Sequence, residues 1–271
     1  MTAGGTGPVE VVAPAKLTLS LRITGVRADG YHLLEAEMVT LDLADTLFIE
    51  DGEGLSISPE PVAGFTGEPG APISTGSDNL VARALAATGR TARVHVAKRV
   101  PPGAGLGGGS ADAAAILRWA GCTDPSVAAG LGADVPFCVA GGRAMVRGIG
   151  EAVEPLSFED RHFTLLLLPF GVDTGSVYRT WDDMTGLGKK VGKVVPGNDL
   201  EAAAVMVEPR LNRWRLLFEV ITGQRPHLAG SGSTWFVEGR AEELGIADGR
   251  VLQLEGEQAV VVSARTCRPT A

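Results

Sequence analysis

The segment Pro101-Pro102-Gly103-Ala104-Gly105-Leu106-Gly107-Gly108-Gly109-Ser110-Ala111 holds five glycines within seven positions. It follows an alternating segment, residues 92–100, that predicts a strand, and precedes an apolar segment, residues 112–119, that predicts a helix. Glycine permits positive φ angles and removes the Cβ that would keep a ligand away from the backbone. Successive N–H groups of such a loop, with those of the following helix N-terminus, can bind phosphate oxygens. The segment therefore predicts a phosphate-binding loop, with Ser110 as a helix cap or as a hydroxyl ligand of phosphate or Mg²⁺.

Two common phosphate-binding motifs fit this loop poorly. No lysine follows the glycines, as a P-loop requires. Gly103, Gly105 and Gly108 satisfy the dinucleotide pattern G-x-G-x-x-G, but a glycine-dense segment satisfies many such patterns. The acidic residue expected at the end of a second strand, about 20 residues later, is missing, because Asp124 lies in a predicted turn. A Rossmann fold therefore remains an alternative that the sequence disfavours.

Strand and helix patterns alternate on both sides of the glycine loop. Residues 16–23 alternate Leu and Ile with polar side chains and predict a half-buried strand. The segment 51–77 is rich in Gly, Pro, Ser and Glu and predicts a surface excursion, and residues 79–87 predict a helix capped by Ser77 or Asp78. These patterns indicate an α+β chain.

The second half of the chain has its own run of elements. An apolar strand is predicted at 163–169, a polar glycine-rich loop at 182–198, helices at 200–207 and 211–221, a second glycine turn at 229–233 and a last strand at 258–263. We therefore predict two domains, residues 1–155 and 156–271, that meet at a nucleotide site.

Charge and composition limit the partners. The 24 basic and 32 acidic residues give a net charge of −8, which argues against nonspecific binding to nucleic acid or to anionic membranes. Three widely separated cysteines without a C-x-x-C pair predict reduced thiols. No apolar run approaches the ~20 residues of a bilayer span, and residues 1–10 lack the features of a signal peptide. We expect a cytoplasmic protein, a monomer or weak homodimer, that binds neither nucleic acid nor membrane.

The glycine loop and two further segments resemble the GHMP kinase superfamily. Pro101 to Ala114 resembles the second superfamily motif, Ala13-Pro-Ala-Lys16 the first, and Leu228-Ala-Gly-Ser-Gly-Ser233 the third, in the same order. The resemblance implies an ATP-dependent small-molecule kinase that uses Mg²⁺. It also implies a two-domain fold, with an N-terminal ATP-binding domain like ribosomal protein S5 and a C-terminal ferredoxin-like domain.

Three other segments are similar to one branch of that superfamily, which phosphorylates 4-diphosphocytidyl-2-C-methyl-D-erythritol in the non-mevalonate isoprenoid pathway. They are Gly25-Val-Arg-Ala-Asp-Gly-Tyr-His32, Leu131-Gly-Ala-Asp-Val-Pro-Phe137 and Gly148-Ile-Gly-Glu151. The similarity implies transfer of the ATP γ-phosphoryl group to the 2-hydroxyl of the methylerythritol unit of this cytidyl diphosphate substrate.

The resemblance also implies roles for single residues. Asp134 matches the catalytic base, and Lys16 matches the active-site lysine. Tyr31 and His32 match the pair that recognises the cytidine end. Residues of the third motif, namely Gly230, Ser231 and Gly232, are expected to close over the phosphates or the substrate.

One position departs from the pattern. The family usually has Asn two residues after the lysine, whereas this chain has Thr18, which keeps a hydroxyl but lacks the amide group. The sequence therefore does not determine which contacts the substrate makes near Thr18. A kinase for another small alcohol and a non-catalytic nucleotide-binding relative remain alternatives, although a pure binder would need neither Lys16 nor Asp134.

Overall fold

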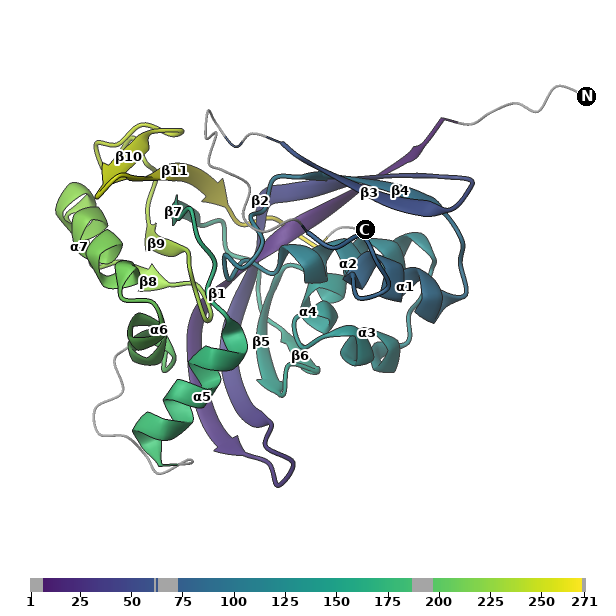
Figure 1. The fold of residues 1–271 in the computed structure, drawn as a ribbon, viewed down its shortest axis with the longest axis horizontal. Coiled ribbons are helices and arrows are strands. Elements are labelled where there is room, and N and C mark those ends of the chain that lie inside the picture. Colours follow the sequence, from purple (N-terminus) through teal and green to yellow (C-terminus); the bar gives the residue numbers. More distant parts are fainter. Residues whose placement is uncertain (1–6, 61, 63–72, 187–196, 270–271) are drawn as a thin grey trace, which may run out of the picture.

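The computed structural model describes residues 7–60, 62, 73–186 and 197–269, and these form two β-sheets with helices packed on both (Figure 1). The first sheet has six strands with the path β3-β4-β2-β5-β6, and β1 pairs with β2 outside this path. The second has five strands in the order β10-β11-β7-β9-β8. The predicted α+β class is confirmed.

A long antiparallel hairpin of β1 (Val9–Val26) and β2 (His32–Glu50) organises the first sheet. The edge of β2 opposite β1 has two partners. Residues 46–50 pair with β4 (Arg93–Lys98), and residues 34–39 pair with β5 (Arg143–Gly148). β3 (Gly54–Pro59) runs parallel to β4, and β6 (Ala152–Pro155) pairs with β5. On this edge, β2 thus pairs with two separate pairs of strands, β4 with β3 and β5 with β6.

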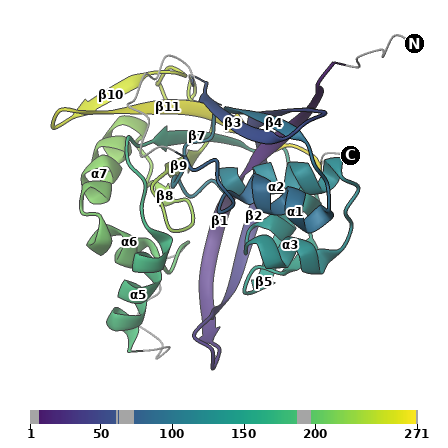
Figure 2. The same cartoon turned by 45° about the vertical axis from the view of Figure 1, so that its right-hand side comes forward.

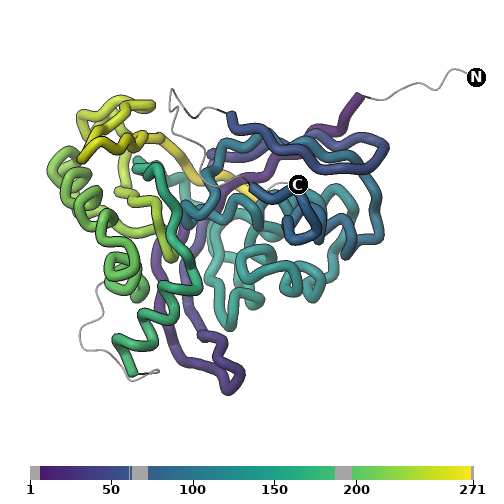
Figure 3. The backbone as a smooth tube through the Cα atoms, in the orientation of Figure 1, coloured from purple at the N-terminus to yellow at the C-terminus, as the bar shows by residue number. Residues whose placement is uncertain are grey.

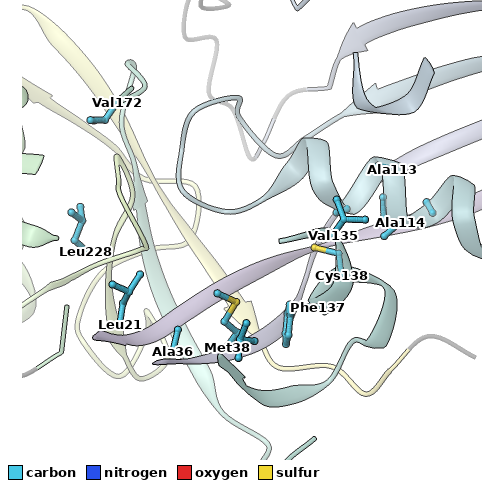
Figure 4. Close-up of a cluster of buried hydrophobic side chains, with 14 of the residues drawn as sticks. Leu21, Ala36, Met38, Ala113, Ala114, Val135, Phe137, Cys138, Val172 and Leu228 are labelled. Carbon is cyan, nitrogen blue, oxygen red and sulfur yellow. The ribbon is translucent and has the colours of Figure 1, made fainter. Parts of the chain in front are cut away.

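Four helices pack beside this sheet: α1 (Leu80–Thr88), α2 (Gly108–Trp119), α3 (Pro125–Leu131) and α4 (Val135–Ala140). α2 packs on β1 and β2 through buried alanines, whose small side chains allow the helix to come close. Figure 4 shows Ala113 and Ala114 beside Val135 and Phe137 of α4, near the hairpin residue Met38. This core holds the glycine loop and the segment before α4 against one hairpin.

The second sheet consists of β7 (His162–Leu167), β8 (His227–Leu228), β9 (Trp235–Glu238), β10 (Val251–Leu254) and β11 (Glu257–Arg265). Three helices accompany it: α5 (Thr174–Thr185), α6 (Glu201–Val207) and α7 (Arg210–Thr222). Figure 2 shows the β1–β2 hairpin between these helices and α1, α2 and α3.

The central strand β7 is buried on both faces, which explains its continuous apolar sequence. Leu166 belongs to the cluster that contains Trp214 and Phe218 of α7. Leu165 and its neighbours on the opposite face belong to the cluster that contains Leu17 of β1 and Leu106 of the glycine loop. The second sheet therefore packs directly on the half of the chain that carries the glycine loop.

Several local predictions need correction. Residues 54–59, assigned to a surface excursion, form the edge strand β3. The N-cap of α1 is Asn79, whose side chain accepts a hydrogen bond from Val81 N at 2.8 Å, and neither Ser77 nor Asp78. The predicted loop 182–198 begins inside α5, because residues 182–185 are helical, and its residues 187–196 lie outside the described residues.

The predicted domain boundary between residues 155 and 156 stays a prediction.

Among the described residues, no helix combines the length and the hydropathy that a bilayer span requires.

Candidate active site

The glycine loop has the backbone that its sequence predicts. Gly103, Gly105 and Gly107 have φ angles of 70°, 77° and 68°, which other residues rarely adopt. Gly107 is itself the N-cap of α2, so the predicted cap role of Ser110 is wrong. Ser110 lies instead in the first helical turn. Because Gly107, in the left-handed conformation, is the cap, α2 begins three positions earlier than it would with Ser110 as its cap.

Hydrogen bonds tie the loop to the second half of the chain. The Ala104 carbonyl accepts from Thr234 N at 3.1 Å, and the Gly103 carbonyl accepts from Val172 N at 3.3 Å. A Cβ at Gly105 would lie 2.1 Å from the carbonyl oxygen of Ala229. The second glycine turn, residues 229–233, therefore packs directly on the first, and position 105 has room only for hydrogen.

Lys16 lies where the three segments that resemble the superfamily motifs meet. Its side chain is buried, and Nζ donates to Thr18 Oγ1 at 3.2 Å and lies 3.4 Å from Asp134 Oδ2. A Cβ at Gly107 would be 2.8 Å from Lys16 Cγ, and a Cβ at Gly230 would be 3.3 Å from Lys16 Nζ. The two glycine turns thus leave a narrow space around the lysine.

Asp134 directly precedes α4 but does not cap it through its side chain. Its carboxylate is 32% exposed, so it faces the lysine and remains open to a ligand. The turn Gly148–Glu151 supports this segment, because Gly150 packs so closely that a Cβ there would lie 2.3 Å from the Ala133 carbonyl oxygen. Glu151 Oε2 accepts from Ile149 N at 2.6 Å and holds that turn.

A cleft of about 620 Å³ opens beside Asp134. His32 lies in it, with Nε2 2.7 Å from Asp182 Oδ1 and its ring centroid 4.7 Å from that of Tyr178. Tyr31 is 60% exposed at the same cleft. Its lining also includes residues 129–133, Pro136, Ile149, Glu151 and Arg179. The turn of the β1–β2 hairpin and the end of α5, far apart in sequence, lie side by side (Figure 3). Both contribute residues to the lining of the cleft.

Two electrostatic features follow from this geometry. Burial, with a smaller effect of the Asp134 carboxylate, raises the pKa of Tyr178 to about 12, so its phenol stays protonated. The carboxylate of Asp182 can only accept, so the hydrogen between it and His32 is carried by Nε2. Nδ1 of a neutral His32 is then an acceptor.

The structure brings several of the sequence-predicted residues together. Around one point lie Lys16, Thr18, Asp134 and the glycines 107 and 230, and at the adjoining cleft lie Tyr31 and His32. The hydroxyl of Ser231 forms a hydrogen bond of 2.8 Å with Thr174 Oγ1, at the start of α5. Sequence reasoning missed Tyr178 and Asp182, whose spacing of four residues places them on one face of α5.

Comparisons with known proteins agree with this geometry. The family model for the GHMP kinases N terminal domain matches residues 79–142, which include the glycine loop and Asp134. A 4-diphosphocytidyl-2-C-methyl-D-erythritol kinase of Paracoccus denitrificans (strain Pd 1222) is 37% identical over 239 residues, covering 83% of this chain and 84% of the relative. The enzyme of the same name from Agrobacterium fabrum (strain C58 / ATCC 33970) is 35% identical over 269 residues, covering 86% and 88%. The chain belongs to the 4-diphosphocytidyl-2-C-methyl-D-erythritol kinase family.

Solved structures support membership of this kinase family. A crystal structure of 4-(cytidine 5'-diphospho)-2C-methyl-D-erythritol kinase superposes with a TM-score of 0.69 at 29% identity, covering 96% of this chain and 100% of that chain. Methanococcus jannaschii mevalonate kinase, at a TM-score of 0.56 and 12% identity over 98% of this chain and 100% of its own, shares the fold alone. The predicted two-domain GHMP kinase fold and the ATP-dependent small-molecule kinase class are confirmed, and the Rossmann alternative is wrong.

Proposed function

We propose that this chain transfers the γ-phosphoryl group of ATP to the 2-hydroxyl of 4-diphosphocytidyl-2-C-methyl-D-erythritol, a step of the non-mevalonate isoprenoid pathway. One observation carries the proposal: the Lys16–Asp134 pair, at 3.4 Å, lies between the glycine loop and the cleft that holds Tyr31 and His32. A phosphoryl donor on the loop and an alcohol from the cleft would meet at this pair.

Asp134 is the base in this proposal. An alcohol is a poor nucleophile, and a carboxylate within hydrogen-bond reach can accept its proton as the new P–O bond forms. Asp134 suits this task because it is partly exposed and because its side chain does not cap α4.

Lys16 would stabilise the transferring phosphoryl group. Its ammonium is buried beside both glycine turns, where a low dielectric strengthens its attraction to negative charge. The hydrogen bond to Thr18 and the contact with Asp134 orient the ammonium before the nucleotide arrives. Little reorganisation is then needed as charge develops on the phosphoryl oxygens.

The loop Pro101–Ala111 would hold the polyphosphate on the backbone N–H groups at the start of α2. Within the described residues there is no group of three His, Cys, Asp or Glu side chains that could hold an ion alone. Mg²⁺ would therefore be held mainly by the nucleotide phosphates, with the hydroxyl of Ser110 as the protein ligand. The ion would neutralise phosphate charge.

The cleft would hold the cytidine end. Tyr31 and Tyr178 offer aromatic faces for a base, and Nδ1 of neutral His32 can accept a hydrogen bond from the exocyclic amine of cytosine. The turn 229–233 would close over the substrate side through Gly230, Ser231 and Gly232. The net charge of −8 supports an enzyme that binds neither nucleic acid nor membrane. Three widely separated cysteines support the cytoplasm as its compartment, and the proposed enzyme is a monomer or a weak homodimer.

A coupled ADP-release assay with ATP and Mg²⁺ tests the proposal. We expect turnover with the cytidyl substrate and little with homoserine or mevalonate. Comparable turnover with either of these alcohols would indicate a kinase for another small alcohol, the alternative that Thr18 leaves open.

The role of Asp134 has its own test. Asp134→Asn should lower kcat about 10²- to 10⁴-fold, the range of a lost general base, while ATP still binds. Asp51→Asn, at an exposed carboxylate directly after β2, is the control and should leave kcat unchanged. A loss of less than about tenfold for Asp134→Asn would exclude it as the base.

A further inference from the structure

His32, the first residue of β2, is held at the cleft by three residues of α5. Its Nε2 lies 2.7 Å from Asp182 Oδ1, and its ring centroid lies 4.7 Å from that of Tyr178 and 5.6 Å from that of Trp181. Tyr178, Trp181 and Asp182 stand at positions i, i+3 and i+4, which lie on one face of a helix. One face of α5 therefore fixes both the place and the hydrogen bonding of a single imidazole.

The carboxylate of Asp182 decides which nitrogen of His32 carries the hydrogen. An ionised carboxylate only accepts, so Nε2 is the donor at this contact. The opposite tautomer would turn the lone pair of Nε2 toward a carboxylate oxygen, within a pair whose side chains are only 11% and 22% exposed. Two acceptors that face each other away from water are unfavourable. Nδ1 of the neutral ring is therefore left with a lone pair that can accept.

An accepting Nδ1 distinguishes the two common pyrimidines at one atom. Cytosine carries an amine at C4, which donates, whereas uracil carries a carbonyl oxygen there, which accepts. With uracil, either Nδ1 would face another acceptor, or the ring would change tautomer and turn the lone pair of Nε2 toward Asp182. A doubly protonated ring would satisfy both neighbours, but high pH disfavours it. Only a base with an amine at C4 gives both ring nitrogens a suitable partner.

We propose that Asp182 is a positioning residue that makes the cleft select cytosine over uracil, because it holds His32 in the tautomer whose Nδ1 accepts a hydrogen bond. The selection rests on the cytidine subsite of the proposed function, and Asp182 is the residue that gives this subsite its preference. Asp182 acts through His32 and takes no part in the transfer of the phosphoryl group. Its effect therefore falls on the choice of base.

The test compares the cytidyl substrate with the same compound carrying uracil in place of cytosine, at about pH 8, in the wild type and in Asp182→Asn. Asparagine has nearly the same shape as aspartate, but its amide can donate as well as accept. Nε2 can then accept from the amide while Nδ1 donates to uracil. We expect the wild type to prefer the cytidyl substrate at least about tenfold in kcat/KM. In the variant, kcat/KM should rise about tenfold for the uridyl compound and stay within about threefold for the cytidyl substrate.

A gain with the uridyl compound separates this role from a purely structural one. If the pair only fastens α5 to the hairpin, Asp182→Asn lowers kcat/KM for both compounds alike or leaves both unchanged, and either result would overturn the proposal. Asp183→Asn removes the same charge from the next residue of α5, which is exposed, and this control should keep the preference of the wild type. Asp182→Glu keeps a group that only accepts, so the preference should survive even if the longer side chain lowers both rates.

Nitrogen-15 NMR of the imidazole side chains detects the tautomer directly and needs no variant of Asp182. Comparison of the wild type with His32→Gln assigns the signals of His32 among the four histidines. A hydrogen on Nε2 of His32 at about pH 8 supports the proposal, and a hydrogen on Nδ1 overturns it. This measurement decides the matter if Asp182→Asn does not fold.

Failure of the proposed function gives a different result from failure of this role. Calorimetry without ATP measures how tightly the two compounds bind to the same proteins. Cytosine-selective binding that Asp182→Asn relaxes, without any turnover, would overturn the kinase activity and leave the role of Asp182 intact. Turnover of the cytidyl substrate with the same base preference in both proteins would overturn the role of Asp182 and leave the proposed function intact. Binding of neither compound would overturn both.

Discussion

Thr18 Oγ1 lies 3.2 Å from Lys16 Nζ and accepts a hydrogen bond from it. Both side chains are buried, and the ammonium has Asp134 as its second polar contact, at 3.4 Å. The residue that departs from the usual family pattern therefore orients the proposed catalytic lysine. Its hydroxyl supplies an acceptor that an amide oxygen could also supply.

Thr18→Val should lower kcat about tenfold with the fold intact. A hydrogen bond to a charged group contributes about 1.5–3 kcal/mol, and valine has nearly the same shape as threonine without the acceptor. Steady-state kinetics with the cytidyl substrate measures the effect. Thr18→Ser keeps the hydroxyl and is the control, expected within about threefold of the wild type. Equal losses in the two variants would contradict this role of the hydroxyl.

Gly105→Ala should abolish most ATP binding, because its Cβ would lie 2.1 Å from the carbonyl oxygen of Ala229. The matched control is Gly121→Ala. Gly121 has a similar φ of 69°, but nothing lies within 4 Å of a Cβ there, so this variant has the backbone strain without the collision. We expect the control to lose about 1–2 kcal/mol of stability and no ATP affinity. ATP affinity is measured by calorimetry. Equal ATP affinity in the two variants would show that the close contact between Gly105 and Ala229 is not needed for nucleotide binding.

Tyr178→Ala should raise KM for the cytidyl substrate about tenfold to a hundredfold, since stacking of one base on an aromatic ring contributes about 1–3 kcal/mol. KM for ATP should not change, because the cleft lies apart from the glycine loop. Tyr178→Phe keeps the ring and should behave like the wild type. If the alanine variant raised both KM values alike, Tyr178 would have a structural role and no specific contact with the cytidine.

Asn198→Ala should destabilise the fold by about 2–4 kcal/mol in urea unfolding. The buried side chain donates to the carbonyl oxygens of Leu228 and Gly230 at 2.9 and 2.6 Å and accepts from Leu200 N at 2.9 Å, so its loss leaves three buried groups without a partner. Asn212→Ala, at a half-buried residue whose side chain bonds only Arg215 among the described residues, is the control and should cost below about 1 kcal/mol.

The sequence predicts the loop 101–111 directly, because its glycines mark the backbone that a phosphate loop requires in one window of sequence. The roles of Lys16 and Asp134 come from the resemblance to the GHMP kinases, because neither residue in its own segment indicates a catalytic side chain. Ser110 is the exception, since a serine before an apolar run resembles a cap, and only the left-handed conformation of Gly107 shows that the helix has already begun.

Other parts depend on contacts that no window contains. Lys98 forms buried ion pairs with Asp45 and Asp112, and the three residues come from separate elements, so each alone resembles a charge at the end of a strand or on a helix face. Tyr178 and Asp182 lie in a segment with Gly175 and several polar residues, which masks the helical period of α5. The strand β3 lies at a sheet edge and pairs only with β4. Such a strand buries little apolar surface, so its glycine and serine residues hide the strand pattern in the sequence.

The double pairing of β2 has a mechanical consequence. The strand that leads into the phosphate loop and the strand that follows the Asp134 segment both hydrogen-bond to β2, at its opposite ends. The phosphate loop and Asp134 are therefore both positioned by β2. The distance between them is fixed by the fold, and movements in the second sheet should not change it. The turn 229–233 belongs to the other sheet. Any opening for substrate entry or product release is thus expected to displace that turn while the spacing between the phosphate loop and Asp134 persists.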